Sequence, residues 1–432
     1  MKRAPFALAI AFMFSIAAHA QIMPQATGPG IPGGVRVGGI LSYDLRFAQN
    51  ASFGGGLGDW ETATASGDLR YSNGSHRRPF SLGYSAGYTI PESGPDYGTG
   101  IFQVVTLSQG FTKEKWNFGF NDSMSFLPEA PTTGFEGVAD SSSGSGSSAP
   151  APPPDQTILT TSGEVIDNNA GAQATYKFNK KMSLNAGVNF SEFRSIGAVG
   201  FNSDGMSIHA GFNDRISARN STGASYSFSH FSFPGTGVYF DSNGISGTIS
   251  HTFNKRLSVS GSVGPSFIVT NANENVNPGG AVTASSTGTT TSKAAYNAAA
   301  SVSYTARKTG YHVSYDHGTS DGAGFLLGAQ FDTVDAGASR RVGQKGNAGL
   351  SFGYRRTSDL LATGGQSYSG IFGGAQYSRK LTESVSAFVG YTVTTQTTQN
   401  VSNPASSNIL SGLFQSISAG IGFSPKPKSF GR

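Results

Sequence analysis

Apolar and polar residues alternate along most of this chain in runs of about nine to twelve residues, and this period of two constrains the fold more than any other feature. In the segment GGILSYDLRFA, Leu41, Tyr43 and Leu45 share one face of an extended backbone, and Asp44 takes the other face. Comparable runs begin near residues 80, 116, 182, 257, 311, 348, 385 and 416. The pattern predicts an all-β protein built from many strands.

Composition and run length favour membrane-spanning strands. The chain of 432 residues contains 60 Gly, 31 Phe and 16 Tyr, and only 13% of its residues are charged, against about 25% in ordinary soluble domains. Glycine and aromatic residues suit turns and strands, and disordered chains have few aromatic residues. Strands of globular domains usually have about 5–6 residues, whereas a tilted membrane-spanning strand needs about 9–11. A soluble β-sandwich also alternates, but its strands are shorter than these runs.

The first twenty residues, MKRAPFALAIAFMFSIAAHA, are typical of a secretory signal peptide. Lys2 and Arg3 precede a short apolar stretch, and Ala18-His19-Ala20 has the small-x-small pattern of a cleavage site. A membrane anchor would need a longer apolar run. Residues 21–35 are then expected to form a short periplasmic segment. No later run reaches about 18 apolar residues, so we expect no transmembrane helix.

Short basic connections and long polar connections take turns between the predicted strands. The short ones are 112–115, 179–181, 213–215, 254–256, 307–310 and 378–380, and the long ones are 50–58, 92–98, 129–167, 196–205, 271–292, 317–324, 358–367 and 396–407. Outer-membrane barrels have short periplasmic turns and longer extracellular loops. We therefore predict a single closed antiparallel up-and-down transmembrane β-barrel over residues 36–423. It should have about 18 strands, with 16 as the alternative, a long flexible extracellular loop at 128–167 and a periplasmic C-terminal tail at 424–432.

The short corners are near-copies of one another, as in FNKKMSL, FNKRLSV and YSRKLTESV. With the leader and the aromatic-bounded alternating strands, they make the chain resemble Gram-negative outer-membrane β-barrel proteins of the putative porin type. The resemblance implies a porin-like channel in the cell outer membrane for passive diffusion of small hydrophilic solutes. The implied partners are outer-membrane lipid and lipopolysaccharide, the barrel-insertion machinery and the solutes, and a homotrimer is left open. One departure is that SPKPKSFGR follows Phe423, where typical members end on an aromatic residue.

Polar residues of the strands should face the interior of such a barrel. The pore-lining candidates are Asp44, Arg46, Asp68, Arg70, His209, Arg219, His312, Asp316 and Arg355. Rings of charged side chains bias which solutes pass a pore. The alternative is that these groups satisfy one another and fill the interior. Barrels of 16–18 strands are wide enough for an aqueous channel, which favours pore lining.

Aromatic residues next to the short corners are candidates for an interfacial girdle. They are Phe111, Trp116, Phe178, Phe212, Phe253 and Tyr377. Amphipathic rings of outer-membrane barrels sit at the level of the lipid headgroups. If this interpretation is right, Lys255 and Arg256 lie on the same rim as Lys180, Arg215 and Arg379.

Signals for chemistry are weak in this sequence. The segment YDHGTSDG brings Asp316, His317, Ser320 and Asp321 together, which suggests a rim-located hydrolase as a minor alternative, but such residues are also common in turns. There is no Cys and no HxxxH pair, so no metal site and no cofactor are predicted. The net charge of +5 is too small to imply nucleic acid. A further alternative is a non-channel surface barrel that displays its long loops for adhesion or envelope export.

Overall fold

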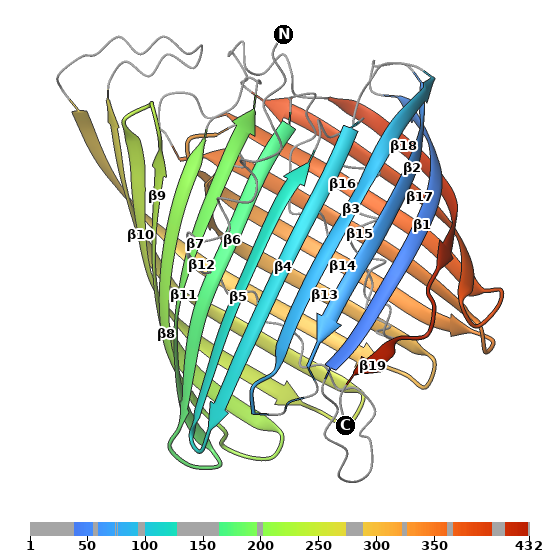
Figure 1. The fold of residues 1–432 in the computed structure, drawn as a ribbon. Coiled ribbons are helices and arrows are strands. Elements are labelled where there is room, and N and C mark those ends of the chain that lie inside the picture. The colour runs from blue at the N-terminus through green and yellow to red at the C-terminus, as the bar shows by residue number, and fades with distance from the viewer. Residues whose placement is uncertain are drawn as a thin grey trace.

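Eighteen long antiparallel strands close into one barrel in the computed structural model of this protein (Figure 1). The structure describes residues 39–54, 59–73, 75, 77–93, 100–127, 164–196, 202–273, 288–321, 326–360, 366–399 and 411–430. The expected signal peptide at 1–20, the segment 21–35 and residues 128–163 of the expected long loop lie outside the described residues.

The strands follow one another around the barrel in chain order. They are β1 (Gly39–Gly54), β2 (Trp60–Ser72), β3 (Phe80–Ser93), β4 (Gly100–Lys113), β5 (Trp116–Leu127), β6 (Glu164–Lys177), β7 (Met182–Ile196), β8 (Ser203–Asp214), β9 (Asn220–Phe233), β10 (Val238–Thr252), β11 (Leu257–Asn273), β12 (Gly288–Thr305), β13 (Thr309–Ser320), β14 (Ala329–Val342), β15 (Gly346–Asp359), β16 (Ser367–Lys380), β17 (Val385–Gln399), β18 (Gly412–Phe423) and the short β19 (Lys428–Phe430). Pairing of β1 with β18 closes the sheet, with Leu45 opposite Phe423 and Gly54 opposite Phe414. The predicted fold and the count of 18 spanning strands are confirmed.

The two faces of the wall differ as the alternation predicts. Large apolar side chains of one parity point outward on every strand, and many remain exposed, with Phe47 at 62%, Val263 at 63% and Ile249 at 67%. Residues of the other parity are mainly Ser, Thr, Gly and charged groups, and many are buried by the barrel itself, including Thr64 and Ser66. An apolar outer face and a polar inner face are the arrangement of a transmembrane barrel. No helix long and apolar enough to cross a membrane occurs among the described residues.

The repeated corners are tight turns closed by one polar side chain. Asn254 Oδ1 accepts hydrogen bonds from the backbone N–H groups of Arg256 and Leu257, at 2.8 and 3.1 Å. Asn179 Oδ1 accepts the equivalent hydrogen bonds from the backbone N–H groups of Lys181 and Met182, at 2.7 and 2.9 Å. Ser217 and Thr382 cap their turns with hydroxyl groups in the same way. The repetition of the corner in the sequence therefore has a local cause, because an Asx or Ser/Thr turn satisfies the backbone at each reversal.

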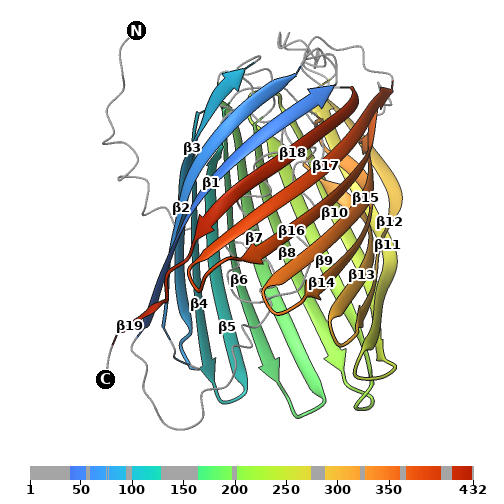
Figure 2. The same cartoon turned by 90° about the vertical axis from the view of Figure 1, so that its right-hand side faces the viewer.

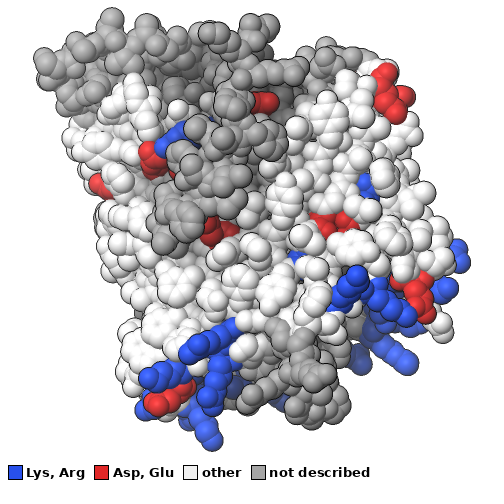
Figure 3. Space-filling view, viewed as in Figure 1, with Lys and Arg blue, Asp and Glu red and all other residues white. Residues whose placement is uncertain are grey.

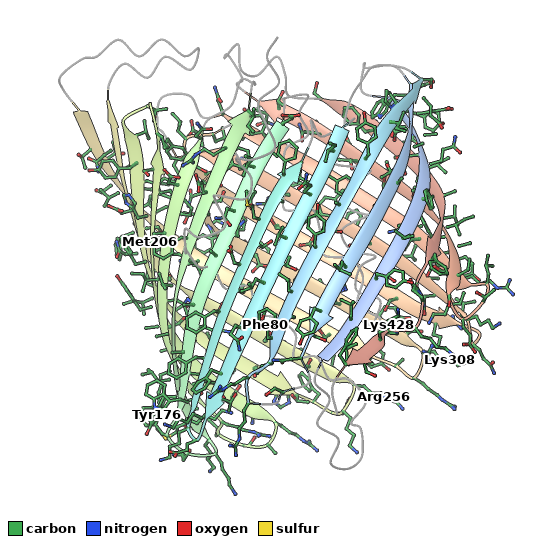
Figure 4. The ribbon with its side chains drawn as sticks, viewed as in Figure 1. Phe80, Tyr176, Met206, Arg256, Lys308 and Lys428 are labelled. Carbon is green, nitrogen blue, oxygen red and sulfur yellow. The ribbon has the colours of Figure 1, made fainter. Side chains whose placement is uncertain are left out.

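The short basic turns lie at one end of the barrel, here called the short-turn rim. Figure 4 shows Tyr176, Arg256, Lys308 and Lys428 at its lower end. The turns that carry Lys180, Arg215, Lys255 and Arg379 join β6–β7, β8–β9, β10–β11 and β16–β17, so all reverse the chain at this end. The prediction that these residues share one rim is confirmed.

The segment after the last spanning strand is not a simple tail. Residues of β19 pair with the start of β1, with Lys428 opposite Leu41 and Phe430 opposite Gly39 (Figure 2). The linker before it is tied to the β16–β17 turn, because Ser424 N–H donates to Ser384 O at 2.7 Å. Lys426 also forms an ion pair with Glu383 at 2.6 Å. The chain thus continues the barrel wall below β18.

Candidate solute pathway

Eight of the nine predicted pore-lining residues lie on the inner face of the wall. These are Asp44, Arg46, Asp68, Arg70, His209, His312, Asp316 and Arg355, each of the parity opposite to the exposed apolar residues of its strand. Arg219 is different, because it lies in the turn before β9, at the short-turn rim. The structure therefore brings the charged strand residues to the interior, and leaves Arg219 at one end of it.

A group on β1 and β2 combines both signs of charge. Asp44 lies directly opposite Asp68 in the β1–β2 pairing. The Arg46 guanidinium lies 3.8 Å above the ring of Phe388 on β17, a cation–π contact that reaches across β18. Glycine on β18 makes room for this contact, because a Cβ at Gly420 would come within 2.4 Å of the Phe388 ring. Ser85 donates a hydrogen bond to Asp68 from β3.

A second charged group lies on β13–β15. Asp316 and Arg355 are close enough to Asp335 for their charges to interact with it. The Arg355 guanidinium lies 5.0 Å from the ring centre of Phe331. The same motif, an arginine over an inner-face phenylalanine beside two carboxylates, thus occurs in both groups. Neither Asp335 nor the two phenylalanines were among the predicted site residues.

Each of the two inner-face histidines is paired with a glycine of a neighbouring strand. A Cβ at Gly187 would come within 2.3 Å of the imidazole of His209, so the ring lies directly on the β7 backbone. His312 lies between Ser303 of β12 and Gly337 of β14. Glycine beside a bulky inner-face group lets the side chain lie flat along the wall instead of projecting into the interior.

The inner face of β9–β12 is lined with hydroxyl groups. Pairs of serines hydrogen-bond across adjacent strands at 2.6–2.8 Å: Ser221 with Ser250, Ser225 with Ser246, and Ser260 with Ser301. The charged groups described above lie on other strands. The interior therefore has a section of wall on β9–β12 that is lined by neutral hydroxyls, and two charged groups on β13–β15 and on β1–β2.

An apolar cluster occupies the inner face near the end opposite the short-turn rim. Its buried members are Phe233, Val238, Phe240, Ile268, Leu327 and Leu360. Residues 326–328, between β13 and β14, reach across to β10, since a Cβ at Gly328 would meet the Phe240 ring at 2.6 Å. Asp321, at the end of β13, accepts a hydrogen bond from Ser203 of β8 at 2.6 Å. The described residues at the two ends of this connection are therefore in contact with β8 and β10.

The six predicted girdle residues lie at the short-turn end of the outer face. Trp116, Phe178, Phe212, Phe253 and Tyr377 are 37–51% exposed, and Phe111 is partly covered. Trp116 stacks on Phe118 at 5.4 Å between ring centres and packs against Tyr176 at 4.7 Å. The aromatic residues thus form patches beside the turns, and their contact with lipid headgroups stays a prediction.

The residues suggested for hydrolysis do not converge. Asp316 faces inward while its neighbour His317 faces outward, because consecutive strand residues point to opposite faces. His317 Nδ1 instead lies 2.8 Å from Asp332, and its ring stacks on Tyr296 with centres 4.1 Å apart. The Asp321 carboxylate accepts the hydrogen bond from Ser203 that is described above. Among the described residues, no group of three His, Cys, Asp or Glu could hold a metal ion.

Comparison with solved structures finds several proteins of low sequence identity. The chain is similar to OpdQ of Pseudomonas aeruginosa (11% identity, TM-score 0.44, 90% of this chain and 99% of that one) and to OccK2 of the same organism in complex with glucuronate (11% identity, TM-score 0.44, 91% and 98%). It is also similar to the FrpB iron transporter of Neisseria meningitidis, with 10% identity and a TM-score of 0.43. This chain covers 64% of that transporter's length. Identities this low transfer no solute or mechanism.

No protein-family model matches the chain, and no curated protein matches it. The functional assignment therefore rests on the residues of the barrel itself.

Proposed function

We propose that this protein is a porin-like channel of the outer membrane that passes small hydrophilic solutes by passive diffusion. The observation that carries the proposal is the contrast between the two faces of the 18-stranded wall. Large apolar side chains face outward, while carboxylates, guanidinium groups and hydroxyls face inward. Barrels of this strand number are wide enough for an aqueous path, which these inner groups would line.

Orientation follows from the two ends of the barrel. Short turns beside an aromatic girdle are typical of the periplasmic side of outer-membrane barrels, and longer connections of the extracellular side. The N-terminal leader supports export through the inner membrane. Lipid, lipopolysaccharide and the barrel-insertion machinery are the partners that such a location requires.

Planar-bilayer recording of the purified protein tests the channel. We expect stepwise conductance increases on insertion, and swelling of protein-loaded liposomes in small neutral sugars. The folded state is checked in parallel by the altered gel mobility of unheated samples. A folded barrel that produces neither steps nor swelling would refute the proposal.

The apolar cluster favours one alternative, a closed barrel that acts through its surface. Phe233, Phe240, Leu327 and Leu360 are 9% exposed or less on the inner face, so they narrow the end away from the short-turn rim. The double variant Leu327→Ser, Leu360→Ser distinguishes the two functions. A channel narrowed by this cluster should conduct more when it is loosened, whereas a surface barrel should stay silent. The matched variant Leu350→Ser removes an outward leucine, and should leave conductance unchanged.

A further inference from the structure

Basic residues are concentrated at the short-turn rim, as the blue band at the lower end of Figure 3 shows. Among the described residues, 20 Lys and Arg lie in the short turns, the adjoining strand ends or the segment after β18. They are Arg77, Arg78, Lys113, Lys115, Lys177, Lys180, Lys181, Arg215, Arg219, Lys255, Arg256, Arg307, Lys308, Arg340, Arg341, Lys345, Arg379, Lys380, Lys426 and Lys428, and every one is exposed. The small net charge of the whole chain hides this distribution.

Acidic residues do not neutralise the rim. Among the described residues, only three Asp and Glu lie there, namely Glu114, Asp214 and Glu383. Among the ion pairs between described residues, the one at the rim joins Lys426 to Glu383. The opposite end of the described barrel is acidic, with Glu61, Glu92, Glu164, Glu192, Asp204, Asp241, Asp332 and Asp359 near strand ends there. The barrel therefore carries an axial charge asymmetry.

Contacts between the basic side chains and the girdle place the charge at one depth. The Arg78 guanidinium lies 5.5 Å from the ring centre of Phe111. Lys113 is the pairing partner of Trp116 across the β4–β5 turn and shares its outward parity. Aromatic rings at a membrane surface sit at headgroup level. The ammonium and guanidinium groups beside them then lie where lipid phosphates lie.

We propose that the short-turn rim binds the headgroups of anionic phospholipids in the leaflet that surrounds it. The inference needs the membrane insertion assumed in the proposed function, but not its conductance. A ring of cations beside apolar girdle rings suits an amphipathic partner with an anionic head and an apolar chain. An anionic solute that enters the interior would interact with the cations and would not contact the girdle rings. Within the rim, Lys113, Arg340 and Arg379 have outward parity, toward lipid.

Tryptophan fluorescence provides a local test. The chain has two Trp residues, and Trp60, which is 5% exposed, lies at the end of the barrel away from the rim. The variant Trp60→Phe therefore leaves Trp116 as a single reporter in the girdle. The protein is reconstituted in vesicles of zwitterionic phosphatidylcholine, into which phosphatidylglycerol or phosphatidylcholine brominated in the acyl chain is titrated. We expect the anionic lipid to associate several-fold more strongly at Trp116, and this preference to fall with added salt.

Two five-site variants in this background isolate the charge. Lys113, Lys115, Lys177, Lys180 and Lys181 flank Trp116 on two neighbouring turns, which are joined by a backbone hydrogen bond from Lys177 N–H to Lys115 O at 2.8 Å. Replacing all five by Gln should bring the ratio of anionic to zwitterionic lipid association at Trp116 close to one. Replacing all five by Arg keeps the charge, and should keep the preference. Gel mobility of unheated samples confirms that each variant is folded.

The possible outcomes separate this inference from the channel. Equal quenching of Trp116 by both brominated lipids in the Trp60→Phe protein would overturn lipid binding. An undiminished preference for the anionic lipid in the Gln variant would overturn it as well. A Gln variant that alters the reversal potential of the channel while keeping its lipid preference would assign the rim to solutes instead, and also overturn it. A clear preference for the anionic lipid without any conductance would support lipid binding. It would count only against the proposed channel function.

Discussion

Two glycines on adjacent strands show how differently one residue type is used in this wall. A Cβ at Gly264 of β11 would lie 1.7 Å from Ile245 O on β10, so the two backbones approach more closely than a side chain allows. A Cβ at Gly247 of β10 would meet nothing within 4 Å. The first glycine is required by the packing of the strands, and the second is not.

Gly264→Ala should therefore destabilise the barrel by about 1–3 kcal/mol, because the methyl group forces the strands apart. Gly247→Ala is the matched control, and should change stability by about 0.5 kcal/mol or less. The free energy of unfolding in a denaturant titration measures both. Equal effects of the two substitutions would contradict the close approach.

Asp122 is an exception to the apolar outer face. It has the outward parity of Phe120 and Met124, in the middle of β5, and its pairing partners are Leu107 and Ala170. A carboxylate facing the hydrocarbon region of a membrane costs free energy.

Asp122→Leu should stabilise the protein in lipid vesicles by about 1 kcal/mol, because it removes a carboxylate from the lipid-facing surface. The free energy of unfolding in vesicles checks this. Ser123→Leu on the inner face is the control, and should give no gain. A loss of stability in Asp122→Leu would mean that another protein covers this part of the wall.

At the scale of elements, the strands and corners were largely predictable, because each strand repeats the same alternation and several short turns repeat the same cap. Leu326 and Leu327 lie directly before β14, which begins at Ala329. Both are buried, and an apolar run does not distinguish a strand from such a connection. Asp335 and Phe331, both on the inner face of β14, were not among the predicted residues. The expected long loop also extended to 167, whereas β6 begins at Glu164.

The pairing of β19 was not predictable, since three residues carry no periodicity. Its contribution can be measured by ending the chain after Phe423. This removes the partner of Gly39, Ile40 and Leu41, and should lower the free energy of unfolding by about 1–3 kcal/mol, the net value of a few hydrogen bonds.

Lys426→Gln is the matched control for this truncation, because it breaks only the exposed ion pair with Glu383 and should have little effect. Thermal unfolding followed by gel mobility compares the two proteins. Equal stability of the truncated and full chains would show that β19 adds nothing to the wall.

At the scale of the molecule, the charge of the interior depends on residues that meet only in the closed barrel. Arg46 and Phe388 are separated by most of the sequence, and no local pattern predicts their contact. The inner carboxylates of the two groups, Asp44, Asp68, Asp316 and Asp335, can be tested as a set. Replacing all four by Asn should shift the reversal potential of the channel toward anions and raise the anion-to-cation permeability ratio several-fold. The reason is that the inner guanidinium groups then no longer face these carboxylates.

The reciprocal variant provides the control for this measurement. Replacing Arg46, Arg70 and Arg355 by Gln should shift the reversal potential toward cations. Both measurements use planar bilayers under a salt gradient. Unchanged selectivity in both variants would show that permeating ions do not pass these groups.

The pairing of Phe430 with Gly39 has a consequence for the order in which the strands are encoded. These two residues lie side by side near opposite ends of the described chain. A short linker could join them without crossing the barrel, and the wall could then be cut at any of the short turns. A gene that starts at Thr309 and ends at Lys308 would encode the same ring of strands in a rotated order. The closed sheet requires neighbouring strands to pair, and it does not require any particular strand to be translated first.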